Sequence, residues 1–148
     1  MSTTELQYHI KLKNGDVGRY VLLPGDPGRV PLIASYLTDA RKIAENREHQ
    51  TYTGLLDGVP VSVTSTGIGG PSTAIAVEEL AKIGADTFIR VGTSGKMQDY
   101  IASGDLIVVS AAVRDEGTAL HYMPLAFPAV ADLDVVECLR NAWEILNA

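Results

Sequence analysis

Cysteine is almost absent from this sequence of 148 residues, in which Cys138 is the only one. A single thiol cannot form a disulfide within the chain, and no spacing of cysteines and histidines typical of a zinc site is present. Cys138 lies in an apolar stretch with helical spacing, so we interpret it as a structural thiol rather than a nucleophile. These observations exclude a disulfide-stabilised scaffold and a dithiol redox centre.

Positive charge is also scarce, because 12 lysines and arginines stand against 18 acidic residues and give a net charge of −6. Proteins that bind nucleic acid need a basic stripe for the phosphates, so this composition argues against nucleic acid as the main partner. It is compatible with one small anion held by two or three arginines. No apolar run approaches the length of about 20 residues that crosses a membrane, and the N-terminus lacks the pattern of a signal peptide. We therefore expect no membrane partner and a cytoplasmic location.

The apolar pattern predicts an α/β fold with a mixed, largely parallel sheet flanked by helices, formed as one domain over residues 1–148. The expected strands span residues 20–23, 52–56, 59–63, 87–91 and 106–112, and the expected helices span 30–37, 71–84 and a final segment that begins at Asp132 or Asp134. The Asp57-Gly58 pair between two extended runs indicates a hairpin. Residues 1–14 and 39–50 are interpreted as polar segments, and 113–130 as a long loop. Because a further strand normally follows such a final helix, we expect the sheet to be incomplete.

Glycine is concentrated in three turns, and each turn follows an apolar run typical of a strand. The turns lie at residues 24–28, 66–70 and 92–95. Glycine tolerates positive φ and lets backbone N–H groups approach a ligand, and successive N–H groups in such turns bind anions. In α/β sheets the ligand lies at the carboxyl ends of the strands. The three turns therefore predict one shared site for a small anionic ligand.

Two arginines accompany these turns. Arg29 follows the first turn at the start of the expected helix, and Arg90 interrupts the apolar strand before the third turn. Guanidinium groups match phosphate and carboxylate geometry. A buried Arg90 would need a charged partner, which an anion in the turn provides. The alternative is an arginine on an edge strand that faces solvent.

The sequence offers no pattern for an organic cofactor. The third glycine of a dinucleotide fingerprint would fall on Ser72, and no P-loop is present. The three histidines are dispersed, without metal-ligand spacing. Glu78 and Glu79 are interpreted as part of the solvated face of their helix. We therefore expect no cofactor beyond a bound anion.

The sequence resembles the nucleoside phosphorylase family, and specifically its uridine phosphorylase branch. The stretches that carry the resemblance are Leu23–Val30, Asn46–Glu48, Ser65–Leu80, Arg90–Gly95, Gly104–Val108 and Phe127–Asp132. Together they extend over essentially the whole chain. The Gly69-Gly70-Pro71-Ser72 form of the second turn is more similar to the uridine branch than to the purine branch.

The resemblance implies specific roles for residues of this chain. The implied phosphate-binding residues are Gly25, Arg29, Arg47, Arg90 and Thr93, of which Arg47 would reach into the site of a neighbouring subunit. The implied nucleoside-binding residues are His9, Thr93, Ser94 and Gly95, with His9 on the ribose 5′-hydroxyl across a dimer interface. Glu48, Ile68 and Ser72 match positions that hold a monovalent cation, potassium for example, in some members. The family assembles as hexamers built from dimers.

The reaction that the resemblance implies is phosphorolysis of uridine to uracil and ribose 1-phosphate, with phosphate as co-substrate. Family members are longer, and their later segments contact the uracil edge and the ribose hydroxyls. This chain is therefore expected to be an N-terminal portion that supplies the phosphate half of the site. Two alternatives stay open: an inactive remnant that binds phosphate or oligomerises, and a purine nucleoside phosphorylase.

Overall fold

A computed structural model describes residues 5–146 of the chain, which forms two compact units, Met1–Thr93 and Ser94–Ala148. The expectation of one domain over the whole chain stays a prediction. None of the helices within the described residues is long and apolar enough to cross a membrane. The cytoplasmic location also stays a prediction.

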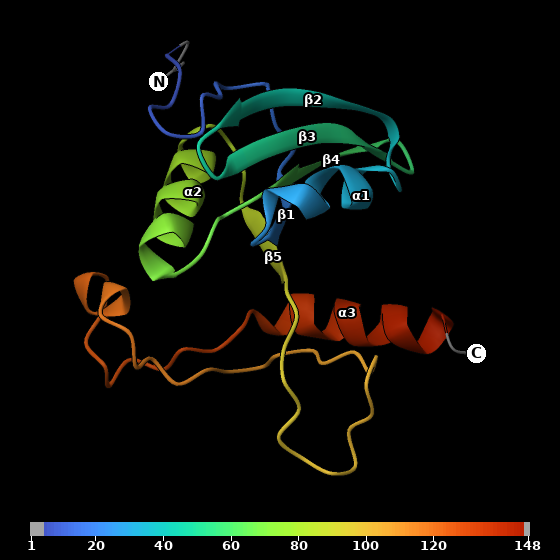
Figure 1. The fold of residues 1–148 in the computed structure, drawn as a ribbon, viewed down its shortest axis with the longest axis vertical. Coiled ribbons are helices and arrows are strands. Elements are labelled where there is room, and N and C mark those ends of the chain that lie inside the picture. Colours follow the sequence, from blue (N-terminus) through green and yellow to red (C-terminus); the bar gives the residue numbers. More distant parts are fainter. Residues whose placement is uncertain (1–4, 147–148) are drawn as a thin grey trace. The chain divides into compact units, whose positions relative to one another are not determined.

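The first unit contains a mixed five-stranded sheet, in the order β2-β3-β4-β1-β5 (Figure 1). Its strands are β1 (Tyr20–Pro24), β2 (Thr38–Asn46), β3 (His49–Leu56), β4 (Val59–Thr64) and β5 (Thr87–Val91). Strand β1 pairs in parallel with both β4 and β5, whereas β3 pairs antiparallel with β2 and β4. The mixed α/β fold is thus confirmed, with parallel and antiparallel pairings equally represented in this sheet. The hairpin between β3 and β4 is also confirmed: Asp57 and Gly58 have φ of +50° and +80°, as a two-residue hairpin turn requires.

Two helices of the first unit follow glycine turns. The 3₁₀ turn η1 (Pro27–Arg29) leads into the short helix α1 (Val30–Ala34), and α2 spans Gly70–Lys82. Helix α2 has a proline in its first turn and ends before Gly84, whose φ is +107°. Both helices lie where the apolar spacing predicts them, although α1 is shorter.

The core of the first unit extends into the N-terminal segment. Ile10 and Leu12 are fully buried and pack with Val21, Leu23 and Leu80. Between residue 5 and β1 the described chain contains no helix or strand, as predicted, but interpreting the segment as merely polar overlooked this apolar pair. Two alternating apolar residues were too short a signal to distinguish from chance.

Two further expectations were wrong. Residues 39–50 are not an irregular polar segment, because Thr38–Asn46 forms the edge strand β2. This strand has two register shifts and no buried residue, so it lacks the alternation that marks a strand in sequence. Residues 106–112 were expected to form a buried strand, but among the described residues only Ala111 makes a bridge, to Val130. Without neighbouring strands the apolar side chains stay exposed, as Leu106 is at 68%.

The second unit contains η2 (Thr118–His121) and α3 (Leu133–Leu146). The Asp132 carboxylate accepts a hydrogen bond from the Val135 N–H at 3.1 Å, so Asp132 rather than Asp134 caps α3. The Arg114 guanidinium donates to the carbonyls of Pro124 and Phe127 and thereby organises the loop before this helix.

Candidate functional site

The first two glycine turns meet at the carboxyl ends of β1 and β4. Thr66 N–H donates to the Pro24 carbonyl, and Gly67 N–H donates to the Gly25 carbonyl, both at 2.9 Å. Since β1 also pairs in parallel with β5, the third turn begins at the same edge of the sheet. The predicted convergence is confirmed for these turns as far as Gly92, within the first unit.

Arg90 lies between two of the turns. Its Nη1 donates to the carbonyls of Leu23 at 3.1 Å and Val91 at 2.8 Å. A Cβ added at Gly25 would lie 3.2 Å from Arg90 Nη2, and one at Gly92 would lie 3.2 Å from Nη1. Glycine at both positions therefore lets the guanidinium approach the backbone on either side.

The expectation that Arg90 is buried was wrong. The residue is exposed, on the strand that forms one edge of the sheet within the described residues. Solvent hydrates its charge, so no anion is needed to compensate burial. However, the guanidinium is held in place by backbone carbonyls, and across residues 5–146 its Nε and Nη2 groups have no hydrogen-bond partner. An oriented, unpaired cation at this edge suits an anion.

Arg29 is the second cation beside the first turn. It ends η1, is half-buried, and its guanidinium makes no hydrogen bond or ion pair within the described part of the chain. Asp26 has a structural role here, because its Oδ1 accepts the Gly28 N–H at 2.8 Å and caps η1. The aspartate thus shapes the turn that carries Arg29.

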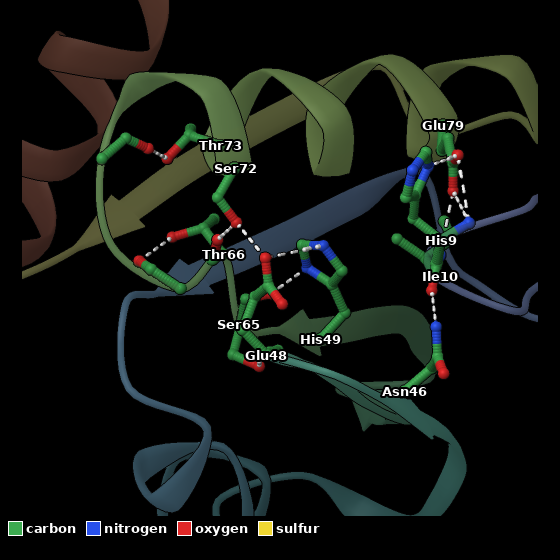
Figure 2. A network of polar contacts seen from close by, with 12 residues as sticks. His9, Ile10, Asn46, Glu48, His49, Ser65, Thr66, Ser72, Thr73 and Glu79 are labelled. Carbon is green, nitrogen blue, oxygen red and sulfur yellow. Dashed lines mark hydrogen bonds and ion pairs between the residues drawn. The ribbon is translucent and has the colours of Figure 1, made fainter.

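A group of oxygen atoms lies at the start of α2, where Glu48 and Ser72 meet (Figure 2). Ser72 Oγ is 2.7 Å from Glu48 Oε1 and 2.5 Å from the Thr66 carbonyl oxygen. Hydrogen bonds to the Glu48 carboxylate hold the pKa of this group below its ordinary value. The largest effect comes from the backbone N–H of Glu48 itself, and the next from the Ser72 hydroxyl. The buried His49 lies behind the carboxylate, with Nε2 3.8 Å from Glu48 Oε1.

This group fits a hard cation in the chemistry of its donors, which are carboxylate, hydroxyl and carbonyl oxygens. The Ile68 side chain is 98% exposed and apolar, so only its backbone carbonyl could contribute. Among residues 5–146, no group of three or more His, Cys, Asp or Glu side chains is placed to hold a metal ion. A transition-metal centre has no basis in this part of the chain.

His9 lies at the other end of α2 and contacts Glu79 (Figure 2). The ring Nδ1 is 2.6 Å from Glu79 Oε1, and the backbone N–H groups of His9 and Ile10 donate to the same carboxylate at 3.0 and 2.9 Å. Burial raises the pKa of Glu79, but hydrogen bonds from Ile10 and His9 outweigh burial and leave this pKa below its ordinary value. The Glu79 carboxylate is therefore ionised at neutral pH.

The expectation that Glu79 belongs to a solvated helix face was wrong, although Glu78 is indeed exposed. Glu79 is only 8% exposed, because it lies on the buried stripe of α2 with Ala76 and Leu80. In the sequence, Glu79 lies three positions after the small apolar residue Ala76, which places the two on one face of a helix. The sequence did not reveal the partner of Glu79, because His9 lies 70 positions away.

The other predicted residues lie outside the contacts described above. Arg47 is exposed in the two-residue turn between β2 and β3, with φ of +54° and no side-chain partner in the described ranges. Thr93 ends the first unit, while Ser94 and Gly95 belong to the second. Ser72 and Glu79 are seven residues apart, which is about 10 Å along a helix, so His9 is remote from the glycine turns.

Comparisons with known proteins agree with this arrangement. The family model described as phosphorylase superfamily matches residues 19–148. A uridine phosphorylase of Thermococcus kodakarensis is 63% identical over 142 residues, which are 96% of this chain and 51% of that protein. A guanosine phosphorylase of Halorubrum lacusprofundi is 43% identical over 93% of this chain and 57% of that protein. The chain thus spans about half the length of these curated relatives.

A solved structure is similar in fold as well as in sequence. The crystal structure of uridine phosphorylase from Vibrio fischeri ES114 matches with a TM-score of 0.92 and 40% identity, over 97% of this chain and 60% of that one. The likeness therefore includes the sheet and the glycine turns described above. With its converging turns, its oriented arginine and the match over residues 19–148, this chain belongs to the phosphorylase superfamily.

Proposed function

We propose that this chain supplies the phosphate-binding half of a nucleoside phosphorylase that cleaves uridine to uracil and ribose 1-phosphate. The observation that carries the proposal is the Arg90 guanidinium, which carbonyls hold between the Gly25 and Gly92 turns and which has no counter-ion among residues 5–146. Relatives named uridine phosphorylases at up to 63% identity support the choice of nucleoside.

In this reaction, an oxygen of phosphate forms a bond to the anomeric carbon of the ribose while the N-glycosidic bond breaks. The bonding pair leaves with the base, which takes up a proton. Positive charge develops on the sugar, so a dianion fixed beneath it stabilises the transition state. Gly25, Arg29, Arg90 and Thr93 would hold that dianion, and positioning supplies the remaining rate enhancement.

The rest of the site is proposed to come from a second copy and from later residues. His9 is remote from the glycine turns of its own chain, and Arg47 lies in an exposed hairpin turn, so each would act in a neighbouring copy. His9 would contact the ribose 5′-hydroxyl there. Thr93, Ser94 and Gly95 would lie along the ribose and base. A homodimer is therefore the proposed unit, with hexamers built from it.

A monovalent cation such as potassium is proposed at the Glu48 and Ser72 oxygens, with the Ile68 carbonyl as a further ligand. The carboxylate and the serine hydroxyl already lie 2.7 Å apart, which supports this assignment. When bound, the cation would neutralise Glu48 and stiffen the turn before α2. No organic cofactor is proposed.

The test is phosphate-dependent release of uracil from uridine by the extended protein, in which this chain is followed by the later residues that the proposal assigns to the nucleoside half of the site. We expect release that stops when phosphate is omitted and that falls when potassium is replaced by tetramethylammonium. The same assay with guanosine in place of uridine tests the alternative of a purine nucleoside phosphorylase, which the similarity to a guanosine phosphorylase supports. Phosphate binding without release from either nucleoside would contradict the proposal and favour an inactive phosphate-binding chain.

A further inference from the structure

We propose that Glu79 is a positioning residue that holds the His9 ring with Nδ1 protonated, so that Nε2 accepts a hydrogen bond from a ligand hydroxyl. This inference rests on the proposed function only in its choice of ligand, the ribose hydroxyl of a nucleoside. The state of the ring itself is a property of this chain and is tested separately.

Glu79 contacts His9 through more groups than a simple ion pair needs. Oε1 lies 2.6 Å from the ring Nδ1, and Oε2 accepts the backbone N–H groups of His9 and Ile10 at 3.0 and 2.9 Å. The side chain of Glu79 is only 10% exposed, compared with 30% for His9. On the other side of His9, Asn46 Nδ2 donates to its carbonyl at 2.7 Å. The backbone of His9 is thus held from both α2 and β2, with the ring against α2.

These contacts determine which ring nitrogen carries the proton. An ionised carboxylate only accepts hydrogen bonds, so Nδ1 must be the donor in the contact with Oε1. In the neutral ring Nε2 is then an acceptor. Among residues 5–146, Nε2 has no partner, and the Tyr8 ring packs edge-on at a centroid distance of 4.9 Å. Carboxylates that fix a histidine in this way orient it for a ligand on the opposite nitrogen.

A purely structural role is the competing explanation. Glu79 could serve only to fasten the N-terminal segment to α2, through the two backbone N–H groups. That role does not need the ring contact and would not depend on the ring tautomer. The Glu79→Gln variant separates the two roles, because its amide oxygen still accepts from the backbone while its NH₂ group donates to Nδ1. Glu78→Gln is the matched control, since Glu78 is the exposed neighbour on the same helix.

The first measurement is the ¹⁵N chemical shifts of the His9 ring nitrogens in the full chain, at a pH where the ring is neutral. We expect Nδ1–H in the wild-type chain and in Glu78→Gln, and a shift to Nε2–H in Glu79→Gln. Equal tautomer populations in all three proteins would overturn the proposal.

The second measurement compares uridine with 5′-deoxyuridine, which lacks the hydroxyl. In the extended wild-type protein, loss of the hydroxyl should lower kcat/KM by about fivefold, the effect of one neutral hydrogen bond. In Glu79→Gln this preference should weaken, because Nε2 then carries the proton and no longer accepts from the hydroxyl, and in His9→Ala it should disappear whether or not Glu79 is replaced. If Glu79→Gln lowers the rates of both substrates equally, the role is structural fastening and the proposal is wrong.

The two measurements also keep the inference separate from the proposed function. Absence of turnover in the extended wild-type protein contradicts the proposed function, and the tautomer shifts alone then decide the role of Glu79. If the wild-type protein shows turnover but the His9 tautomer is the same in Glu79→Gln as in the wild type, the role proposed for Glu79 is wrong and the proposed function is unaffected.

Discussion

At the scale of single residues, two arginines of this chain differ in the groups that their guanidinium contacts. Arg19 forms an ion pair with Asp86 at 3.0 Å, so its charge is already balanced. Arg90 is oriented by two carbonyl oxygens, which direct the guanidinium without neutralising it. A carbonyl partner keeps the full positive charge for an anionic ligand, whereas a carboxylate partner would compete with that ligand. By this criterion Arg90 is the candidate for anion binding, and Arg19 has a structural role.

The first prediction at this scale concerns phosphate affinity. Arg90→Ala should raise the Kd for inorganic phosphate by roughly 10- to 100-fold, because charged hydrogen bonds contribute about 1.5–3 kcal/mol. Arg90 is exposed, so circular dichroism and the unfolding midpoint should change little. Isothermal titration with phosphate measures the effect, and Arg19→Ala serves as the control. Unchanged phosphate affinity in Arg90→Ala would place the anion site elsewhere.

At the scale of elements, the turn between β4 and α2 connects the two halves of the candidate site. Gly67 has φ of +71°, and its N–H donates to the Gly25 carbonyl in the first turn. A Cβ at this position would lie 2.6 Å from Glu48 Cγ and 3.0 Å from Ser72 Oγ. Gly67 is therefore required twice, for its backbone conformation and for the space occupied by Glu48.

This double requirement leads to a prediction about stability. Gly67→Ala should lower the free energy of unfolding by more than about 2 kcal/mol, since the strain of positive φ adds to a steric clash. Gly58→Ala is the matched control, because Gly58 also has positive φ, at +80°, but nothing lies within 4 Å of an added Cβ. It should lose only about 1 kcal/mol. Urea unfolding of the three proteins measures both values, and equal losses would show that the clash with Glu48 relaxes at no cost.

The elements that sequence predicted well depend on short-range signals. The Asp57-Gly58 hairpin, the start of α2 at its glycine turn and the strand Thr87–Val91 each carry their turn residues within a few positions. The family was also recognised from local stretches, and the match over residues 19–148 confirms it. The convergence of the first two turns followed from a general property of parallel sheets rather than from any one residue.

The elements that sequence missed depend on partners far along the chain. Strand β2 exists because β3 pairs with it, and its register shifts remove the alternation that would reveal it. Residues 106–112 have the composition of a strand but lack neighbouring strands among the described residues. Glu79 is buried through His9 and Ile10, about 70 positions away. Burial of Arg90 was expected because the residues of a strand do not by themselves show whether it lies at the edge or in the interior of a sheet.

At the scale of the whole molecule, two site residues are proposed to serve a neighbouring copy rather than their own chain. Arg47 occupies an exposed hairpin turn and has a left-handed backbone, which is uncommon for arginine. His9 is held at the far end of α2 from the glycine turns. In the symmetric dimer proposed above, these two residues would reach the partner's site, and each copy would complete the other.

This arrangement predicts complementation between inactive variants. In the extended protein, Arg47→Ala and Arg90→Ala should each lose most phosphorolysis when assayed alone, because every site lacks one phosphate ligand. After mixing, unfolding and refolding, half of the dimers carry one copy of each variant. One site in each mixed dimer then combines the intact Arg90 of one copy with the intact Arg47 of the other. Activity should therefore recover to about a quarter of the wild-type value.

The size of the recovery distinguishes the possible arrangements. If Arg47 acts within its own chain, each site of a mixed dimer lacks one arginine and mixing restores nothing. The control is a mixture of Arg90→Ala with Arg29→Ala, whose two residues are both proposed to act in their own chain and which should therefore stay inactive. Recovery in the first mixture alone would show that the phosphate site is shared between copies. Recovery in both mixtures would mean that Arg29 also acts in the site of the neighbouring copy, and its assignment to the site of its own chain would be wrong.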